Sequence, residues 1–171
     1  MTQERDKKFV SQSQMILLVD LDVAYVPTPK KVVRSMLQLA SLRRGETLLD
    51  LGAGDGRIMI EAARHFGART VGVEIDPARV ERIRERLTAT GTRADVIEAD
   101  LFNVLLSPAD VITMYLSPSA NARLAPKLKA EAKKGTRIVS LDYPLPEWKE
   151  ERELIVEAGG IERKLYLYKL T

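Results

Sequence analysis

Apolar residues in the central part of the chain form short runs, which alternate with longer segments whose apolar positions recur every three or four residues. Runs of about five residues rich in Val, Ile and Leu are typical of buried strands, and the longer periodic segments are typical of amphipathic helices. The runs cover residues 47–51, 71–75, 95–98, 111–115 and 137–141. Strands that alternate with helices predict an α/β fold, with a parallel sheet covered on both faces.

The segment before the first predicted strand carries its own boundary signals. Residues 25–29 (Tyr-Val-Pro-Thr-Pro) contain two prolines, and a proline disfavours helical geometry in the residue before it. We expect Thr28 to cap a helix that begins at Pro29, because the first helical position favours proline. Residues 1–14 are mostly polar and charged. We interpret residues 1–24 as an N-terminal arm and expect one domain over residues 25–171.

The end of the chain breaks the alternation of strands and helices. Apolar residues 154–156 and 165–168 are too close together for a helical crossover, and Gly159-Gly160 lies between them. Two strands joined by such a glycine pair predict an antiparallel hairpin. The predicted fold is therefore a Rossmann-like three-layer αβα sandwich. Its sheet has seven strands, is mostly parallel, and ends in an antiparallel C-terminal hairpin strand.

The composition excludes several kinds of chemistry. The chain has 171 residues, no cysteine and a single histidine, His65. A protein without cysteine has no disulfide, thiol nucleophile, iron–sulfur cluster or cysteine zinc site. One histidine does not favour a histidine metal centre or a Ser-His-Asp triad. We therefore expect no metal, and we interpret His65 as a surface residue near a helix end.

Positive and negative charges are interleaved along the chain. There are 27 Lys and Arg residues against 24 Asp and Glu, which gives a net charge of +3. Residues 81–86 (Glu-Arg-Ile-Arg-Glu-Arg) show the mixing. It is typical of a solvated helix face, whereas a nucleic-acid groove more often carries charges of one sign. Nucleic acid is therefore not favoured as a partner.

The sequence also bears on location. Apolar residues 15–19 form a run far shorter than the ~20 residues of a membrane helix. Asp20 and Asp22 follow this run, in place of the small residues of a signal-peptide cleavage site. We expect a cytoplasmic protein without membrane association. Only six residues are Asn or Gln, while Arg, Lys and Glu are frequent, a mixture that favours heat tolerance.

A glycine-rich turn follows the first predicted strand. The motif Asp50-x-Gly52-x-Gly54-x-Gly56 stands between a strand and a helix, where open α/β sheets bind ligands. Glycine permits the tight turn and lets a ligand approach the backbone closely. The spacing differs from the G-x-G-x-x-G of dinucleotide folds. Asp50 and Asp55 would repel a pyrophosphate, but they suit a ligand with an ammonium group and a nearby sulfonium.

Two further carboxylates end the next two predicted strands. Glu74 can accept hydrogen bonds from ribose hydroxyls, as carboxylates in NAD-binding proteins also do. Asp100 can accept a hydrogen bond from the amino group of adenine, with Leu101 and Phe102 beside the ring. Three acids at the ends of three consecutive strands, around a glycine loop, indicate a ligand site.

These motifs resemble a known family. Residues 50–57 (Asp-Leu-Gly-Ala-Gly-Asp-Gly-Arg) and 71–76 (Val-Gly-Val-Glu-Ile-Asp) are similar to the first two motifs of class I S-adenosylmethionine-dependent methyltransferases. The resemblance to archaeal broad-specificity protein-lysine methyltransferases, and to their mitochondrial relatives, rests on further segments: residues 25–29, 113–116, 124–128, 135–140 and 165–168. The likeness runs from about Tyr25 to Tyr168.

The resemblance implies S-adenosyl-L-methionine as the cofactor and lysine side chains of other proteins as acceptors. The implied cofactor-binding residues are Tyr25, Thr28, Asp50, Gly52, Gly54, Asp55, Gly56, Glu74, Ile75, Asp100 and Leu101. The candidate catalytic residues are Tyr115 and Asp142, although the residues after the fifth strand, 141–144, differ from those that relatives often carry.

Methyl transfer to an amine requires alignment of the acceptor and needs neither a thiol nor a metal. A lysine has a pKa near ~10.4 and must lose a proton first, which an apolar slot favours. We expect Tyr115 and Leu116 to line that slot, with Tyr25 and Thr28 closing it. Asp142 is expected either to accept a proton or hold the ammonium, or to serve only in a turn. For Trp148 we favour packing over a place at the slot entrance.

The predicted function is broad-specificity methylation of protein lysines. Leu116-Ser117-Pro118 differs from the Asn/Asp-Pro-Pro-aromatic signature of enzymes that methylate adenine or glutamine nitrogens. The cofactor sheet takes up most of the chain, which leaves little for a lid over a small substrate. Alternatives are a small-molecule or RNA acceptor, a non-catalytic S-adenosylmethionine-binding module, and an NAD dehydrogenase. The oligomeric state stays open, with a monomer as one option.

Overall fold

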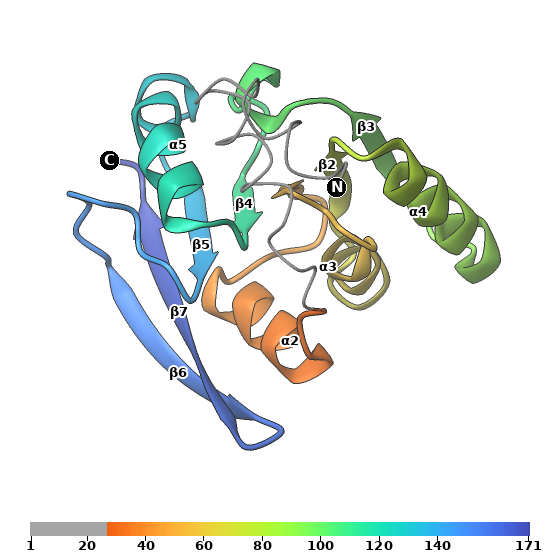
Figure 1. Cartoon of the computed structure of the whole chain (residues 1–171), viewed down its shortest axis with the longest axis horizontal. Helices are drawn as coiled ribbons and strands as arrows, with labels where there is room; N and C mark the ends of the chain where they lie inside the picture. Colours follow the sequence, from red (N-terminus) through yellow and green to blue (C-terminus); the bar gives the residue numbers. More distant parts are fainter. Residues whose placement is uncertain (1–26) are drawn as a thin grey trace, which may run out of the picture.

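The computed structural model describes residues 27–171 (Figure 1). The predicted N-terminal arm and Tyr25 lie outside these residues. In chain order the elements are α2 (Lys30–Leu39), β1 (Thr47–Leu51), α3 (Arg57–Glu61), η2 (Ala62–Phe66), β2 (Arg69–Glu74), α4 (Pro77–Thr90), β3 (Asp95–Glu98), η3 (Leu101–Asn103), β4 (Val111–Met114), α5 (Pro118–Glu131), β5 (Arg137–Leu141), β6 (Arg152–Ala158) and β7 (Ile161–Lys169).

The strands form one seven-stranded sheet in the order β3-β2-β1-β4-β5-β7-β6. Strands β1 to β5 pair in parallel, and β7 is antiparallel to both β5 and β6. Gly159 and Gly160 form the turn of the β6–β7 hairpin with φ angles of 64° and 79°. A two-residue hairpin turn of this kind needs positive φ at both positions, which glycine adopts without strain. The prediction of a mostly parallel sheet with an antiparallel C-terminal hairpin is confirmed.

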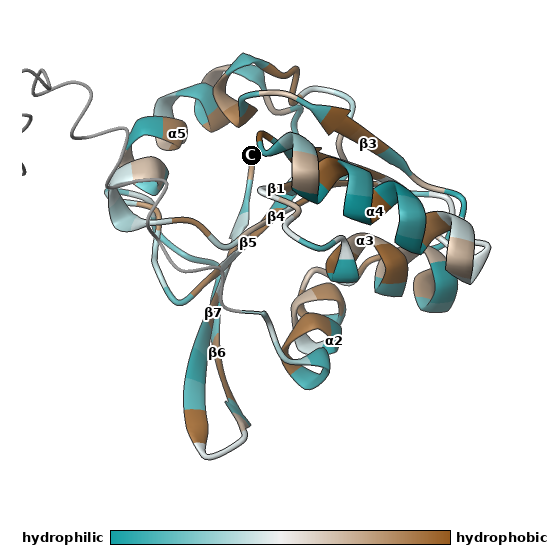
Figure 2. Cartoon of the chain, turned by 45° about the vertical axis from the view of Figure 1, so that its right-hand side comes forward, coloured by the Kyte–Doolittle hydropathy of each residue, from teal (hydrophilic) through white to brown (hydrophobic). Residues whose placement is uncertain are grey.

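Helices α2, α3 and α4 cover one face of the sheet, and α5 covers the other (Figure 2). Successive residues of a strand point to opposite faces, and β1 shows this directly. Leu48 packs with residues of α2 and α3, whereas Leu49 packs with residues of α5. Both views show the β6–β7 hairpin reaching beyond the parallel strands (Figures 1 and 2).

Close packing of α3 on β2 fixes the helix that follows the glycine turn. A Cβ atom at Gly72 of β2 would overlap the sulfur of Met59 and crowd the Cβ of Ala53. The missing side chain at Gly72 therefore lets α3 approach the sheet, and it sets the position of the turn between β1 and α3.

The start of α2 corrects one sequence prediction. The helix begins at Lys30 with Pro29 in the N-cap position, and no side chain caps it. Thr28 is therefore not the cap. Pro29 keeps an extended ψ of 145°, so it stands just outside the helix. Thr28 is buried, and its carbonyl accepts a hydrogen bond from Arg57 instead.

His65 lies in η2 with its side chain 48% exposed, 3.3 Å from a carboxylate oxygen of Glu61. This agrees with its predicted place on the surface near a helix end. Over residues 27–171, none of the helices is long and apolar enough to cross a membrane.

Candidate active site

Four of the residues singled out in the sequence, Asp50, Glu74, Asp100 and Tyr115, lie where the strand order reverses. Strand β1 lies between β2 and β4, and ligands of open α/β sheets bind beyond the carboxyl ends of the strands at such a point. Asp50 is the second-last residue of β1, Glu74 is the last residue of β2, and Tyr115 directly follows β4. Ala99, after β3, donates its N–H to the carbonyl of Glu74 at 3.0 Å, which brings Asp100 to the same edge.

The glycine turn is held to the end of β2 by backbone hydrogen bonds. Gly52, Gly54 and Gly56 have φ angles of 78°, 61° and 77°, a region that favours glycine. The N–H groups of Gly52 and Ala53 both donate to the carbonyl of Val73 at 2.9 Å. These hydrogen bonds fix the position of the turn relative to the end of β2.

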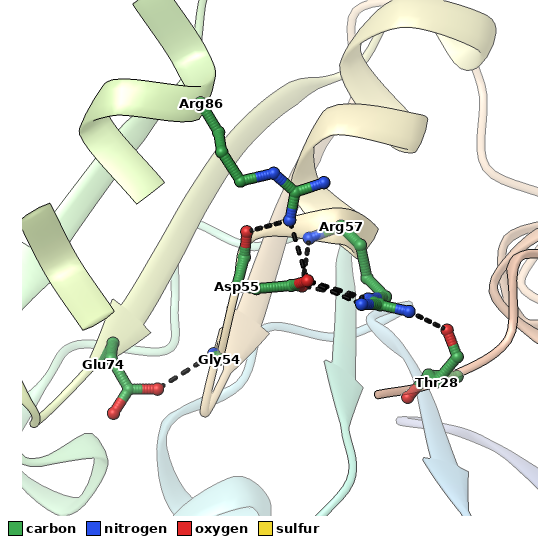
Figure 3. Close-up of polar contacts among 6 residues, drawn as sticks. All are labelled: Thr28, Gly54, Asp55, Arg57, Glu74 and Arg86. Carbon is green, nitrogen blue, oxygen red and sulfur yellow. Dashed lines mark hydrogen bonds and ion pairs between the residues drawn. The ribbon is translucent and has the colours of Figure 1, made fainter. Parts of the chain in front are cut away.

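Glu74 is buried, and backbone groups orient its carboxylate. Gly54 donates its N–H to Oε2 at 2.9 Å (Figure 3). Ile75 and Asp76 donate their N–H groups to Oε1 at 3.0 and 3.1 Å. A carboxylate has about four lone-pair positions, so room remains for a hydroxyl donor. Ile75, next to it, is 56% exposed, which leaves an apolar surface at the same edge.

Asp50 is a buried acid whose two oxygens differ in their hydrogen-bond partners. Its Oδ1 accepts a hydrogen bond from the Thr113 hydroxyl at 2.8 Å, and Oδ2 is buried without a hydrogen-bond partner among residues 27–171. Burial raises the pKa of Asp50 to about 7, against the lowering effect of Thr113, and the nearby carboxylates of Glu74 and Asp55 add to the rise. A buried oxygen without a partner is costly. A cationic donor in this place would both satisfy it and favour its ionised form.

Asp55 is held by two arginines from different helices. Its Oδ2 lies 2.6 Å from Nη2 of Arg57 and 2.8 Å from Nη1 of Arg86, which also donates to the Asp55 carbonyl at 2.6 Å (Figure 3). The carboxylate expected to face a cationic ligand is therefore already balanced by these partners, and it anchors the tip of the glycine turn to α4. A contact between Asp55 and a ligand stays a prediction.

Arg57 makes a further contact that joins two parts of the site. Its Nη1 donates to the carbonyl of Thr28 at 2.7 Å (Figure 3). Residues 27–29, directly before α2, are thereby tied to the glycine turn. This connection places Thr28 beside the predicted ligand site.

The end of β3 is shaped by a short 3₁₀ turn. Asp100 caps η3, and its Oδ1 accepts a hydrogen bond from the N–H of Phe102 at 3.0 Å. Asp100 and Leu101 are both half-buried. The guanidinium of Arg123, from α5, lies 3.8 Å from the ring centre of Phe102, so that one face of this ring is covered by the protein itself.

The opposite side of the site is formed after β4 and β5. A Cβ atom at Gly52 would lie 3.1 Å from the Cδ2 atom of Leu116, so Leu116 packs on the glycine turn. Tyr115 is half-buried, and burial raises the pKa of its hydroxyl. Asp142 has a positive φ of 62° and forms an ion pair with Arg163 of β7, at 2.7 Å between Oδ2 and Nη2.

The loop after β5 is tied down by α5. The buried Asn121 donates from Nδ2 to the carbonyl of Tyr143 at 2.9 Å. Trp148 packs edge-on against Tyr168 with ring centres 5.9 Å apart, in agreement with the packing interpretation of this residue. Within residues 27–171 no group of three or more metal-ligating side chains occurs.

The model of the ANTKMT methyltransferase domain matches residues 50–152. The chain belongs to this family. The matched range begins at Asp50, and it contains the glycine turn, Glu74, Asp100, Tyr115 and Asp142.

Among the relatives of this methyltransferase, a protein-lysine N-methyltransferase of Saccharolobus islandicus is 41% identical over 149 residues, 85% of this chain and 92% of that protein. The mouse adenine nucleotide translocase lysine N-methyltransferase is 37% identical over 131 residues, 75% of this chain and 56% of that protein. The chain thus spans little more than half the length of this mouse relative.

A solved structure described as an RNA methyltransferase of Salinibacter ruber, in complex with S-adenosyl-L-homocysteine, superposes with a TM-score of 0.79. It is 41% identical, and the match covers 85% of this chain and 94% of that one. Two relatives of equal identity are therefore named for different acceptors. A tRNA methyltransferase of Bacillus subtilis, with a TM-score of 0.72 and 16% identity, shows the fold alone.

Sequence reasoning missed the arginines of this methyltransferase's site. Arg57 follows the last glycine of the turn directly, and an arginine at the start of a helix, two residues after Asp55, is a signal that indicates an ion pair. Arg86 and Arg163 reach their partners across 31 and 21 positions of the chain. No local pattern marks contacts of that length.

Proposed function

We propose that this chain binds S-adenosyl-L-methionine and transfers its methyl group to lysine side chains of other proteins, with broad specificity. The observation that carries the proposal is the buried, unsatisfied Oδ2 of Asp50 beside the glycine turn, at the switch point of a methyltransferase fold. Membership in a methyltransferase family and the named activity of the Saccharolobus islandicus relative support it.

The residues around the glycine turn fit such a cofactor. Asp50 offers a buried anionic oxygen for an ammonium group, and Glu74 has room for a ribose hydroxyl. The proposed adenine contacts are Ile75, Asp100 and Leu101. The remaining proposed contacts are Tyr25, Thr28, Gly52, Gly54, Asp55 and Gly56.

When bound, S-adenosylmethionine supplies a methyl group on a positively charged sulfur. The lone pair of an acceptor amine forms the new nitrogen–carbon bond as the sulfur–carbon bond breaks, S-adenosylhomocysteine leaves, and a proton passes from the amine to water. The protein has to align the acceptor and admit it as a neutral amine. We propose that Tyr115 and Leu116 line the slot and that Asp142 supports it.

RNA is a second candidate acceptor, because the Salinibacter ruber relative is described as an RNA methyltransferase. Lysine is preferred here since several relatives are named as lysine methyltransferases. The residues after Tyr115 also lack the Asn/Asp-Pro-Pro-aromatic signature of planar nitrogen acceptors.

The test is incubation of the purified protein with methyl-labelled S-adenosylmethionine, in separate reactions with extract protein, total RNA and a metabolite fraction. We expect label in protein, on the side-chain nitrogen of lysines. Asp50→Ala serves as the inactive control, and Glu81→Gln, on the exposed side of α4, as the matched surface variant. Label in RNA or metabolites alone would overturn the lysine assignment, and cofactor binding without any transfer would indicate a binding module.

We also propose that residues 25–171 form one domain preceded by an arm at residues 1–24, and that the protein acts in the cytoplasm and tolerates heat. The charge-rich composition with few Asn and Gln supports heat tolerance. Thermal unfolding tests it: a midpoint within the mesophile range of roughly 45–65 °C would contradict it.

A further inference from the structure

Three side chains from separate strands meet on the acceptor side of the site. Tyr115 directly follows β4, Asp142 directly follows β5, and Arg163 lies in β7. Nε of Arg163 is 3.1 and 2.9 Å from the two oxygens of Asp142, and its Nη2 is 2.7 Å from Oδ2. The carbon at the centre of the guanidinium is 5.1 Å from the ring centre of Tyr115.

The carboxylate of Asp142 is held by Arg163 and by a backbone N–H group. Its Oδ1 contacts Nε of Arg163 and accepts from the N–H of Lys164 at 3.2 Å, while Oδ2 contacts Nε and Nη2 of Arg163. The 2.7 Å contact of Nη2 is an ion pair without hydrogen-bond geometry. Arg163 thus neutralises the charge of Asp142, and an acceptor amine that reaches this carboxylate also meets the guanidinium.

Arg163 is only 8% exposed, and its cation lies within the ~6 Å range of attraction to an aromatic face. The titratable groups that face the pair are Tyr115 and, from the loop after β5, Tyr143. On β6 the residue paired with Arg163 is Val156, which packs with apolar residues of α2. Among the described residues, therefore, Arg163 and Asp142 supply the opposing charges next to Tyr115.

We propose that Arg163 determines the charge state in which the acceptor is received, by neutralising Asp142 and holding a fixed cation beside Tyr115. The inference rests on the proposed lysine methyltransferase function. A second cation is disfavoured next to Arg163, so the slot selects the neutral amine, which is the form that can attack the methyl group. Arg163 is a specificity-determining residue, and Asp142 positions it.

Removal of Arg163 and removal of the Asp142 charge should shift the pH midpoint of kcat in opposite directions. Arg163→Gln leaves the carboxylate of Asp142 free to pair with the acceptor ammonium, which stabilises the unreactive form. Asp142→Asn leaves the guanidinium without its counter-charge, which disfavours the ammonium further. An opposite charge within a few ångström typically shifts a pKa by about 1–3 units, so each single change should move the pH midpoint of kcat by at least about one unit.

The experiment measures kcat and KM for a lysine-bearing peptide as a function of pH. The variants are Arg163→Gln, Asp142→Asn, the double variant and Arg152→Gln, an exposed arginine of the same hairpin as a matched control. We expect the midpoint of kcat to rise in Arg163→Gln and to fall in Asp142→Asn, with the double variant and Arg152→Gln near the wild type. Arg163→Gln should lose about tenfold in kcat below the midpoint without a rise in KM.

Binding of S-adenosylmethionine to each variant, measured by calorimetry, reports on folding and on the cofactor side. If Arg163→Gln does not fold, Asp142→Asn and the charge-preserving Arg163→Lys carry the test, with Arg163→Lys expected to keep the wild-type midpoint. Unmoved midpoints, or shifts in the same direction for both single variants, would overturn the role of Arg163. A wild-type protein that methylates no lysine would instead overturn the proposed function.

Discussion

Around Asp50 and Glu74 the site is made of a glycine turn, backbone N–H groups and carboxylates from neighbouring parts of the chain, and one acidic oxygen is left without a partner. Around Tyr115 it is made of side chains from three distant strand ends, whose charges are paired with each other. We expect the first side to receive a cationic ligand. The second offers an ion pair and an aromatic ring, and we expect it to receive a neutral acceptor.

The strongest way to separate the two sides is to remove the buried acid. Asp50→Ala should weaken binding of S-adenosylmethionine by about 2–5 kcal/mol, because the ligand ammonium loses its buried partner. Titration calorimetry measures the change. Asp142→Asn, on the other side, should leave this affinity nearly unchanged, and equal losses in both variants would mean that the two sides do not act separately.

The pH dependence of stability should also originate on the cofactor side. The pKa of Asp50 is raised to about 7 in the folded chain from an ordinary value of 3.8. The unfolded chain therefore releases this proton at lower pH, and the stabilisation, complete below pH 3.8, is lost as the pH rises through 7. Between roughly pH 5 and 8 the free energy of unfolding should fall by about 3 kcal/mol from this residue.

Urea unfolding without cofactor at the two pH values checks this, with Asp50→Asn as the comparison. That variant should lose this part of the decline, whereas Glu81→Gln should keep it. An undiminished decline in Asp50→Asn would place the titrating group elsewhere. Affinity for S-adenosylmethionine should follow the opposite course and rise with pH, since the ligand ammonium favours the ionised Asp50.

A smaller loss of affinity for S-adenosylmethionine is expected at Asp100, which follows β3. Asp100→Ala should weaken binding of S-adenosylmethionine by about 1–3 kcal/mol through lost hydrogen bonding to adenine. Because Asp100 also caps η3, Asp100→Asn keeps a capping side chain and separates the two roles. Unchanged affinity in both variants would show that adenine lies elsewhere.

The smallest change in cofactor affinity is expected at Tyr115. Tyr115→Ala should leave that affinity nearly intact while it reduces methyl transfer to lysine about tenfold or more, since the slot loses its wall. Tyr115→Phe keeps the ring under Arg163 and tests the hydroxyl alone. Loss of cofactor binding in Tyr115→Ala would assign this residue to the cofactor side or to the core.

The contrast between the sides also explains what could be predicted from the sequence. The strands, the glycine turn and the Gly159-Gly160 hairpin depend on local patterns, and the structure confirms the predicted sheet. The start of α2 was predicted one residue early, at Pro29, because the proline was placed inside the helix.

The contacts of the acceptor side depend on distances along the chain that local patterns do not record. The sequence indicates Asp142 as a candidate residue. Its partner Arg163 lies on the hairpin, where the sequence pattern predicts an ordinary exposed strand residue. The structure instead buries it against Asp142. In the same way, the sequence predicts Asp55 as an acid that faces the ligand, but it gives no sign that Arg57 and Arg86 are its partners.

Methyl transfer to lysine is tested most directly by mass-spectrometric mapping of the label, after one reaction that offers protein and RNA together with methyl-labelled S-adenosylmethionine. We expect label on lysine side-chain nitrogens, absent with Asp50→Ala and retained with Glu81→Gln. Label confined to RNA, or no label despite bound cofactor, would contradict it.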